Sequence, residues 1–133
     1  MKKKAYIALS KIPSAGNGLF AKMIIRPNEL IEDNAVAVTR YDNPTALRLM
    51  KEFNLNYVED QYLAFEWGER EKYLTFCQGL IQYVNHSDAP NTRVERDYVN
   101  NRLRLYSLRE ISKDEEFTHY YVDRDEYIKN NKF

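Results

Sequence analysis

Three short segments of the chain carry residue types that could bind or transform a ligand, and the first lies near the N-terminus. Residues 14–20 read SAGNGLF, with two glycines between two strand-like stretches. Glycine lets a backbone come close to a ligand where a side chain would block it, but the same pair also suits a plain hairpin turn. The segment is not a dinucleotide-binding fingerprint, because no third glycine follows and no helix is expected after it.

The second segment, residues 83–91 (YVNHSDAPN), concentrates small polar side chains directly after an apolar stretch. Asn85 and His86 can each form several hydrogen bonds, so burying them is costly unless a ligand or backbone groups satisfy them. Both a ligand site and a well-bonded structural loop account for this pattern. A metal site is not indicated, since His119 is the only other histidine and no Cys or acidic cluster has ligand spacing. Ser87 beside His86 also makes a poor catalytic pair, because adjacent side chains rarely face each other.

The third segment, residues 111–121, reads ISKDEEFTHYY. Charged residues followed by an apolar and aromatic stretch are typical of a turn that leads into a strand, where tyrosines usually serve in packing. Taken by itself, this segment predicts no chemistry.

The elements that must position these segments are mostly strands. Short apolar stretches predict strands over residues 5–12, 19–25, 30–39, 62–67 and 73–77. Residues 94–108 predict a hairpin, with Asn100 and Asn101 supplying the positive φ angles of a tight turn. Only residues 43–53 predict a helix, because Asn43 can cap it and Pro44 suits the first helical position. The expected fold class is therefore β-rich.

Length and charge limit the function further. A chain of 133 residues predicts one compact domain, and 20 basic residues balance 20 acidic ones. A net charge of zero gives no general attraction to nucleic acid or to an anionic membrane. The single cysteine, Cys77, cannot form an internal disulfide, which fits a reducing compartment. No apolar run is long enough to span a bilayer, so the sequence predicts a soluble intracellular protein.

Taken together, the three segments resemble the SET domain of protein-lysine methyltransferases. That family carries a G-x-G segment near its N-terminus, an N-H-S-x-x-P-N loop in its second half and an E-E-[LF]-T-x-x-Y strand near its end, and all three occur here in that order. Residues 22–31 and 62–65 extend the resemblance to nearly the whole chain. The likeness is greatest to the minimal SET proteins of large viruses, which have no cysteine-rich flanking domains.

Some positions depart from the family pattern. Gln82 stands where a basic residue is common, Asp114 where glycine is common, and Tyr120 where an aspartate often precedes the last tyrosine. Asn34 stands where many SET domains have a tyrosine, and no role is carried onto it. The zinc-binding cysteines that follow many SET domains are absent, so we expect the tail, residues 122–133, to close the site with Tyr127 and Ile128.

The resemblance implies a mainly β (β-rich α+β) SET fold over residues 1–133, with several small curved sheets, a short helix and a knot-like crossing near the C-terminus. It implies S-adenosylmethionine as the methyl donor, a lysine side chain as the acceptor and no metal. The site residues that it implies are Ala15, Gly16, Asn17, Asn85 and His86 for the cofactor, Tyr121 beside the transferred methyl, and Tyr62, Tyr106, Thr118 and Tyr127 for the lysine channel.

The implied substrate is a histone tail or another host protein, in the cytoplasm or the nucleus, and in a host cell if the protein is viral. The viral likeness also suggests a homodimer. One alternative is a catalytically idle SET domain that binds a lysine-bearing peptide or the cofactor without turnover, which a methyl-release assay would reveal. A nucleic-acid-binding β-domain is disfavoured by the charge balance and by the lack of an Arg/Lys stripe with spaced aromatic residues. A salt-sensitive gel shift with DNA or RNA would support that alternative.

Overall fold

The structure, a computed structural model, describes residues 3–40, 64–66 and 73–120, together with positions 44, 45, 48 and 52. In this part of the chain, nine strands form two sheets, and the 3-10 helix η1 (Leu80–Tyr83) directly precedes the polar segment at 85–87. The prediction of a mainly β fold with several small sheets is confirmed.

The first sheet has the order β1-β2-β9-β6, and its strands are β1 (Ala5–Leu9), β2 (Asn17–Ala21), β9 (Glu116–His119) and β6 (Asn85–His86). Strands β1, β2 and β9 pair antiparallel, whereas β6 lies parallel to β9 with Asn85 opposite Thr118. The parallel pairing brings the polar segment at 85–87 beside the last described strand. This juxtaposition agrees with the expected crossing near the C-terminus, while residues 121–133 lie outside the described part.

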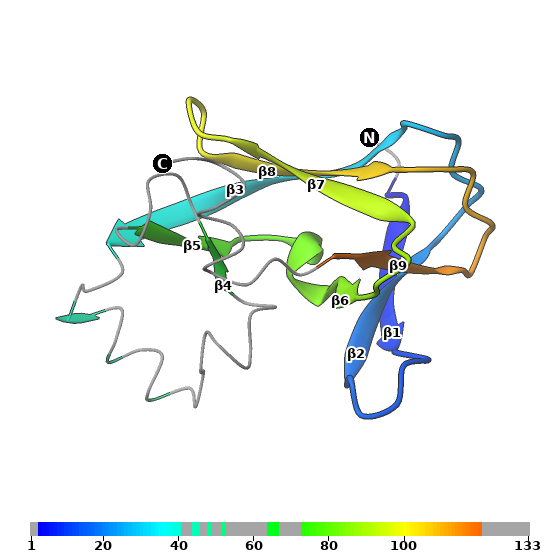
Figure 1. Cartoon of the computed structure of the whole chain (residues 1–133), viewed down its shortest axis with the longest axis horizontal. Coiled ribbons are helices and arrows are strands. Elements are labelled where there is room, and N and C mark those ends of the chain that lie inside the picture. Colours follow the sequence, from blue (N-terminus) through cyan, green and yellow to red (C-terminus); the bar gives the residue numbers. More distant parts are fainter. Residues whose placement is uncertain are drawn as a thin grey trace.

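The second sheet has the order β4-β5-β3-β8-β7, formed by β4 (Ala64–Glu66), β5 (Tyr73–Cys77), β3 (Leu30–Arg40), β8 (Arg102–Ser107) and β7 (Thr92–Asp97). The long strand β3 uses its first half to pair with β8 and its second half to pair with β5, both antiparallel. The β1–β2 hairpin stands across the direction of β3 and β8 (Figure 1).

Strand alternation separates the core from the outer face of this second sheet. Along β8, Leu103, Leu105 and Ser107 are buried, while the residues between them are half-buried on the other face. Residues from both sheets and from η1 complete the core, among them Leu19, Ile25, Ile81, Ile111 and Phe117, all fully buried.

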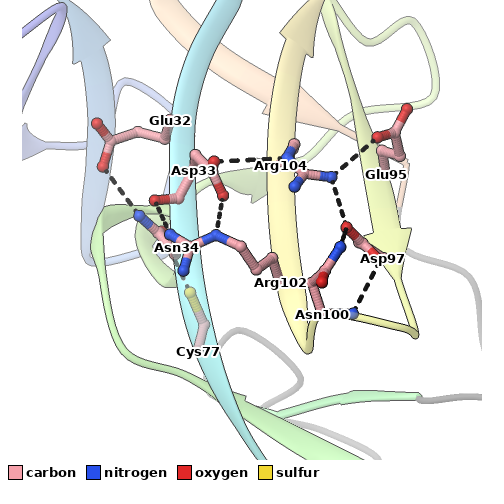
Figure 2. Close-up of polar contacts among 9 residues, drawn as sticks. All are labelled: Glu32, Asp33, Asn34, Cys77, Glu95, Asp97, Asn100, Arg102 and Arg104. Atoms are coloured by element: carbon pink, nitrogen blue, oxygen red, sulfur yellow. Dashed lines mark hydrogen bonds and ion pairs between the residues drawn. The ribbon is translucent and has the colours of Figure 1, made fainter.

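The outer face of β3, β8 and β7 carries a charged network instead of apolar side chains (Figure 2). Arg102 Nε lies 2.6 Å from Asp33 Oδ1, and Arg104 contacts Asp33, Glu95 and Asp97 at 3.4, 3.4 and 3.1 Å. Hydrogen bonds from Asn100 and Arg104 favour the charged form of Asp97 and lower its pKa to about 2. The network therefore links three strands through opposite charges that face one another.

The predicted elements differ from the observed ones mainly at their ends. The strands expected over residues 5–12 and 19–25 end earlier, at Leu9 and Ala21. The first of them ends there because the Ser10 N–H bonds to the Gly16 carbonyl and closes a loop. Strands were correctly predicted over residues 30–39 and 73–77. Of the predicted helix, positions 44, 45, 48 and 52 are helical, and the remaining positions lie outside the described residues.

The predicted hairpin is present, but its turn is longer than a two-residue turn. Asp97 pairs with Arg102 across the two strands, which leaves four residues in the loop. The Asp97 carboxylate accepts hydrogen bonds from the N–H groups of Val99 and Asn100 at 3.1 Å each. Only Asn101 of the two asparagines has a positive φ, of 52°, because the aspartate stabilises the first part of the turn.

Asn34 anchors η1, which leads directly into the polar segment at 85–87. Its side chain is 8% exposed, and its Oδ1 accepts hydrogen bonds from the Ile81 N–H at 3.1 Å and the Cys77 thiol at 3.3 Å. Figure 2 shows the contact between Asn34 on β3 and Cys77 on β5. A Cβ on Gly79 would come within 2.4 Å of the Asn34 side chain, so glycine leaves the space that this amide fills.

Candidate functional site

The first part of the glycine segment lies in the loop of the β1–β2 hairpin, residues 10–16, which we call the glycine loop, and its second part belongs to β2. The Ser10 N–H donates to the Gly16 carbonyl at 2.8 Å, and the Ala15 N–H donates to the Ile12 carbonyl at 3.2 Å. Gly16 has a φ of 74°, a left-handed conformation that glycine adopts without strain. A Cβ at Gly16 would meet nothing within 4 Å, so backbone conformation rather than space calls for glycine there. The segment is a hairpin loop, and whether it also binds a ligand depends on what surrounds it.

The carboxylate of Glu116, on β9, holds this loop in place. Its Oε2 accepts a hydrogen bond from the Ser10 hydroxyl at 2.7 Å, and its Oε1 accepts one from the Lys11 backbone N–H at 2.9 Å. The same Oε2 accepts a hydrogen bond from Asn85 Nδ2 at 3.3 Å. One carboxylate therefore ties the glycine loop to the polar segment at 85–87, although Glu116 is far in sequence from both.

Gly18 leaves the space in which this carboxylate lies. A Cβ added to Gly18 would come within 2.5 Å of Glu116 Oε2 and within 3.3 Å of Asn85 Nδ2. The backbone of Gly18 is not left-handed, so its requirement differs from that of Gly16. The first glycine is needed for a turn and the second for close packing of a charged group.

The orientation of the Asn85 side chain follows from its two neighbours, which are both acceptors. Asn85 Nδ2 donates to the Asn17 carbonyl at 3.0 Å and to the Glu116 carboxylate. Because only the NH₂ group can donate, the amide oxygen must face the other way. Within the described residues this oxygen accepts no hydrogen bond. It is thus a fixed acceptor beside the glycine loop, suited to a ligand that carries N–H groups.

The last asparagine of the polar segment, Asn91, has a structural role. Its side chain is buried and bonds to the backbone of β9 as a neighbouring strand would, accepting from the Thr118 N–H and donating to the Glu116 carbonyl, both at 2.8 Å. Its backbone carbonyl also accepts from the Leu108 N–H. Both interpretations of this segment therefore apply, at different residues: Asn91 is well bonded within the fold, whereas Asn85 presents an acceptor.

His86 lies next to Asn85 on β6. Its Nε2 lies 2.9 Å from Asp88 Oδ1, and its ring centroid lies 5.1 Å from that of Tyr120. Tyr120 is 44% exposed, so the two rings form part of the surface at this end of β9. One polar ring and one aromatic ring therefore lie side by side on this surface.

His119, which pairs with His86 across β6 and β9, is buried. Burial is the main cause that lowers its pKa to about 3, and the nearby charges of Arg96 and His86 act in the same direction. His119 is therefore neutral in the folded protein at ordinary pH. A side chain that must lose its proton to fold makes stability depend on pH.

We expect the protein to lose stability when the pH falls from 7 to 5. In that range the unfolded chain protonates His119 near its usual pKa of about 6.5, while the folded chain does not, so acid favours unfolding. The expected loss from this group is about 2 kcal/mol. Urea unfolding at pH 7, 6 and 5 measures it.

The variant His119→Asn removes this titrating group, so it should flatten the pH dependence of stability. His86→Asn should keep that dependence. These are the only two histidines in the chain, so the comparison is complete. An equal loss of stability between pH 7 and 5 in wild type and His119→Asn would show that this assignment is wrong.

The residues predicted for the site are only partly brought together. Ala15, Gly16, Asn17, Asn85 and His86 lie around the glycine loop and β6, and Thr118 is on the adjacent strand β9. Tyr106 is not part of this group: it lies on the outer face of β8, where the Arg93 guanidinium stacks 4.4 Å from its ring. Tyr62, Tyr121 and Tyr127 lie outside the described residues.

Glu116 is the site residue that sequence reasoning missed. The sequence places the Glu-Glu pair at a turn that leads into a strand and within the E-E-[LF]-T-x-x-Y motif, but it indicates no contact for either side chain. The alternation of Glu116, Phe117 and Thr118 along β9 was a usable signal, because a charged residue inside a strand needs partners on its own face. Glu115 differs from its neighbour: it pairs with Arg109 and accepts from the Ser112 N–H, and these contacts lower its pKa.

The described residues also bear on metal binding and membrane insertion. In that part of the chain, no group of three His, Cys, Asp or Glu side chains could hold a metal ion. None of its helices has the length and apolar character needed to cross a membrane.

Comparison with known proteins identifies the fold. A histone-lysine N-methyltransferase of Candida albicans, specific for lysine 36 of H3, is 31% identical over 112 residues, which are 82% of this chain and 13% of that protein. The chain thus spans about an eighth of that relative. A solved Plasmodium falciparum structure, assigned as a histone methyltransferase, superimposes with a TM-score of 0.63 at 25% identity, covering 91% of this chain and 95% of that one.

A structure of the Chaetomium thermophilum Polycomb Repressive Complex 2 bound to S-adenosylmethionine gives a TM-score of 0.76 at 21% identity. It covers 99% of this chain and 17% of that chain, and at this identity it shows the shared fold alone. The SET domain family matches residues 16–122, from the glycine loop to the end of β9 and slightly beyond. This chain belongs to the SET domain family.

Proposed function

We propose that this protein is a protein-lysine N-methyltransferase that uses S-adenosylmethionine. The observation that carries the proposal is the Asn85 amide, held by Asn17 and Glu116 so that its oxygen stays available beside the glycine loop. The α-amine of the cofactor is a donor that suits this acceptor. Membership of the SET family and the histone-lysine methyltransferase relative support the same conclusion.

The proposed cofactor residues supply complementary contacts. Backbone groups of Ala15, Gly16 and Asn17 would hold the amino-acid end, the Asn85 oxygen would accept from the amine, and His86 would face the adenine. When bound, S-adenosylmethionine supplies an activated methyl group on a sulfonium. The task of the chain is then to orient the two reactants at about 3 to 3.5 Å and to exclude water.

The acceptor must also lose a proton. A lysine with a pKa of about 10.4 is neutral in only about one molecule in a thousand near physiological pH, a cost of about 4 kcal/mol. A channel of tyrosine rings lowers this cost, because an apolar environment disfavours the ammonium form. We propose Tyr62, Thr118 and Tyr127 for this channel and Tyr121 for the position beside the methyl. Tyr106 is left out, since it stacks with Arg93 on the outer face of β8.

The same comparison supports a proposal for the substrate class. The Candida albicans relative acts on a histone, so we propose a histone tail or a similar lysine-bearing protein segment as the substrate and the nucleus as its place of action. Incubation with labelled S-adenosylmethionine and a proteome extract, followed by mass spectrometry, would identify the methylated lysines directly.

We expect S-adenosylmethionine to bind with the same affinity in the presence and absence of a metal chelator, because none of the proposed cofactor contacts uses a metal. Isothermal titration calorimetry measures this. Absence of binding would contradict the proposed function, while binding without methyl transfer to any extract protein would indicate an idle SET domain.

The tail provides a separate test. Deleting residues 127–133 is expected to weaken cofactor binding and activity while the fold is retained, because Tyr127 and Ile128 are proposed to cover the site. Burying one such side chain is worth about 1.5 to 3 kcal/mol, so the loss in affinity should be at least about tenfold. Calorimetry and urea unfolding together measure it. Normal turnover by the shortened chain would mean that another element covers the site.

A further inference from the structure

We propose that Glu116 is a positioning residue for the cofactor: it holds the glycine loop closed and fixes the direction of the Asn85 amide. This inference rests on the proposed function, since it names what prepares that site. It assigns no direct contact between Glu116 and a reacting atom.

The Glu116 carboxylate is a meeting point of several hydrogen bonds. Three donors from two separate segments converge on one carboxylate: the Ser10 hydroxyl and the Lys11 N–H from the glycine loop, and Asn85 Nδ2 from β6, at 2.7, 2.9 and 3.3 Å. The Ser10 hydroxyl in turn accepts from the Ile12 N–H at 3.0 Å, so the contact extends into the loop. A carboxylate has only acceptor positions, and it satisfies all three donors at once.

Neither glutamine nor aspartate can replace Glu116 in these contacts. A glutamine has the same shape but one oxygen and one NH₂ group. If its oxygen faces Lys11, its NH₂ group faces Asn85 Nδ2, and if it is turned round, the NH₂ group faces the Lys11 N–H. Either way two donors oppose each other. An aspartate keeps the charge, but it is one methylene shorter and cannot reach all three donors from β9.

Glu116 also sets the orientation of the Asn85 side chain. With Glu116 and the Asn17 carbonyl both acting as acceptors, the amide has a single satisfied orientation, and its oxygen faces away from them. Removing the carboxylate leaves one neighbour to set this orientation. The cofactor amine would then meet an amide that is less well held, and the protein would have to order it on binding.

The test compares Glu116→Gln and Glu116→Asp with wild type. Both variants are expected to bind S-adenosylmethionine about tenfold or more weakly, as judged by calorimetry, and to raise the KM for the cofactor while kcat at saturation changes little. Wild-type affinity in Glu116→Gln would overturn the proposal. Wild-type affinity in Glu116→Asp would also overturn it, because negative charge alone would then be sufficient.

A matched control separates positioning from general stability. Glu29 also accepts a backbone N–H, that of Arg26, and pairs with Lys4 at 3.0 Å, but it lies in the turn before β3. Glu29→Gln removes a similar set of contacts outside the site, so it is expected to leave cofactor affinity unchanged. A comparable loss in Glu29→Gln would show that the effect is not specific to Glu116.

A second variant keeps the test valid if Glu116→Gln folds poorly. Gly18→Ala retains Glu116 and Asn85 but places a methyl group 2.5 Å from Glu116 Oε2, so the carboxylate must move. It is expected to reproduce the loss of affinity. The double variant Gly18→Ala/Glu116→Gln should lose little more than either single one, because both act through the same contact. Fully additive losses would contradict this.

Hydrogen exchange makes the result independent of the proposed function. In the ligand-free protein, the Lys11 amide is expected to exchange about tenfold or more faster in Glu116→Ala than in wild type, because the alanine leaves it without its acceptor. If wild type binds no S-adenosylmethionine, the proposed function is wrong even though this exchange difference remains. If wild type binds it and the exchange rates are equal, the role of Glu116 is wrong.

Discussion

Replacing Tyr121 with phenylalanine is expected to slow methyl transfer about 100-fold or more, while the affinity for S-adenosylmethionine stays close to that of wild type. Counting from the Glu-Glu pair, Tyr121 occupies the position whose hydroxyl is proposed to lie beside the transferred methyl. A hydroxyl that interacts mainly with charge developing in the transition state contributes to the rate and little to ground-state binding. Single-turnover methyl transfer at saturating cofactor measures this effect.

Tyr120→Phe is the matched control, because it removes the same group one residue away. The ring of Tyr120 lies 5.1 Å from that of His86, and phenylalanine preserves that ring contact. We expect a mild effect on the rate. A severe defect in Tyr120→Phe with a nearly normal Tyr121→Phe would show that the assignment is wrong by one residue.

The second large effect is expected for Asn85→Ala, which should remove most of the affinity for S-adenosylmethionine. The variant deletes the acceptor proposed for the cofactor amine and also the bonds from Nδ2 to the Asn17 carbonyl and to Glu116. Each buried polar group left without a partner costs about 1 to 3 kcal/mol, which corresponds to a loss of up to about 100-fold per group. Calorimetry measures the change.

Asn100→Ala provides the comparison. Asn100 lies in the β7–β8 turn of the second sheet, where its side chain bonds to Asp97 at 2.8 Å, whereas the strands of the proposed site belong to the first sheet. The same change of side chain there should leave cofactor affinity unchanged. Wild-type affinity in Asn85→Ala would remove Asn85 from the site.

Local pattern predicted several elements well, and the reason is that they depend on near neighbours. Arg102 to Ser107 alternate between polar and apolar residues, apart from the buried Ser107, and form β8 with one face in the core. The apolar run at 73–77 is β5 with the expected bounds. A period of two along an extended chain is visible in the sequence because each side chain's direction follows from its position.

The two-residue strand β6 could not be predicted in this way. Asn85 and His86 are extended because they pair in parallel with Thr118 and His119. Such a pairing depends on where a distant segment lies, and two polar residues carry no periodic signal. The order of the three motifs indicated that these segments meet, but not which atoms face one another.

The sequence by itself determined which chemical groups are available: two glycines, the polar residues of 83–91 and a pair of glutamates before the last strand. Only the tertiary structure decided how they are used. It placed Glu116 against the glycine loop and Asn85, placed Glu115 against Arg109, and placed Tyr106 against Arg93. The physical reason is that a hydrogen bond needs its partners within about 3 Å, and the distances between segments remote in sequence are set by packing of the whole core.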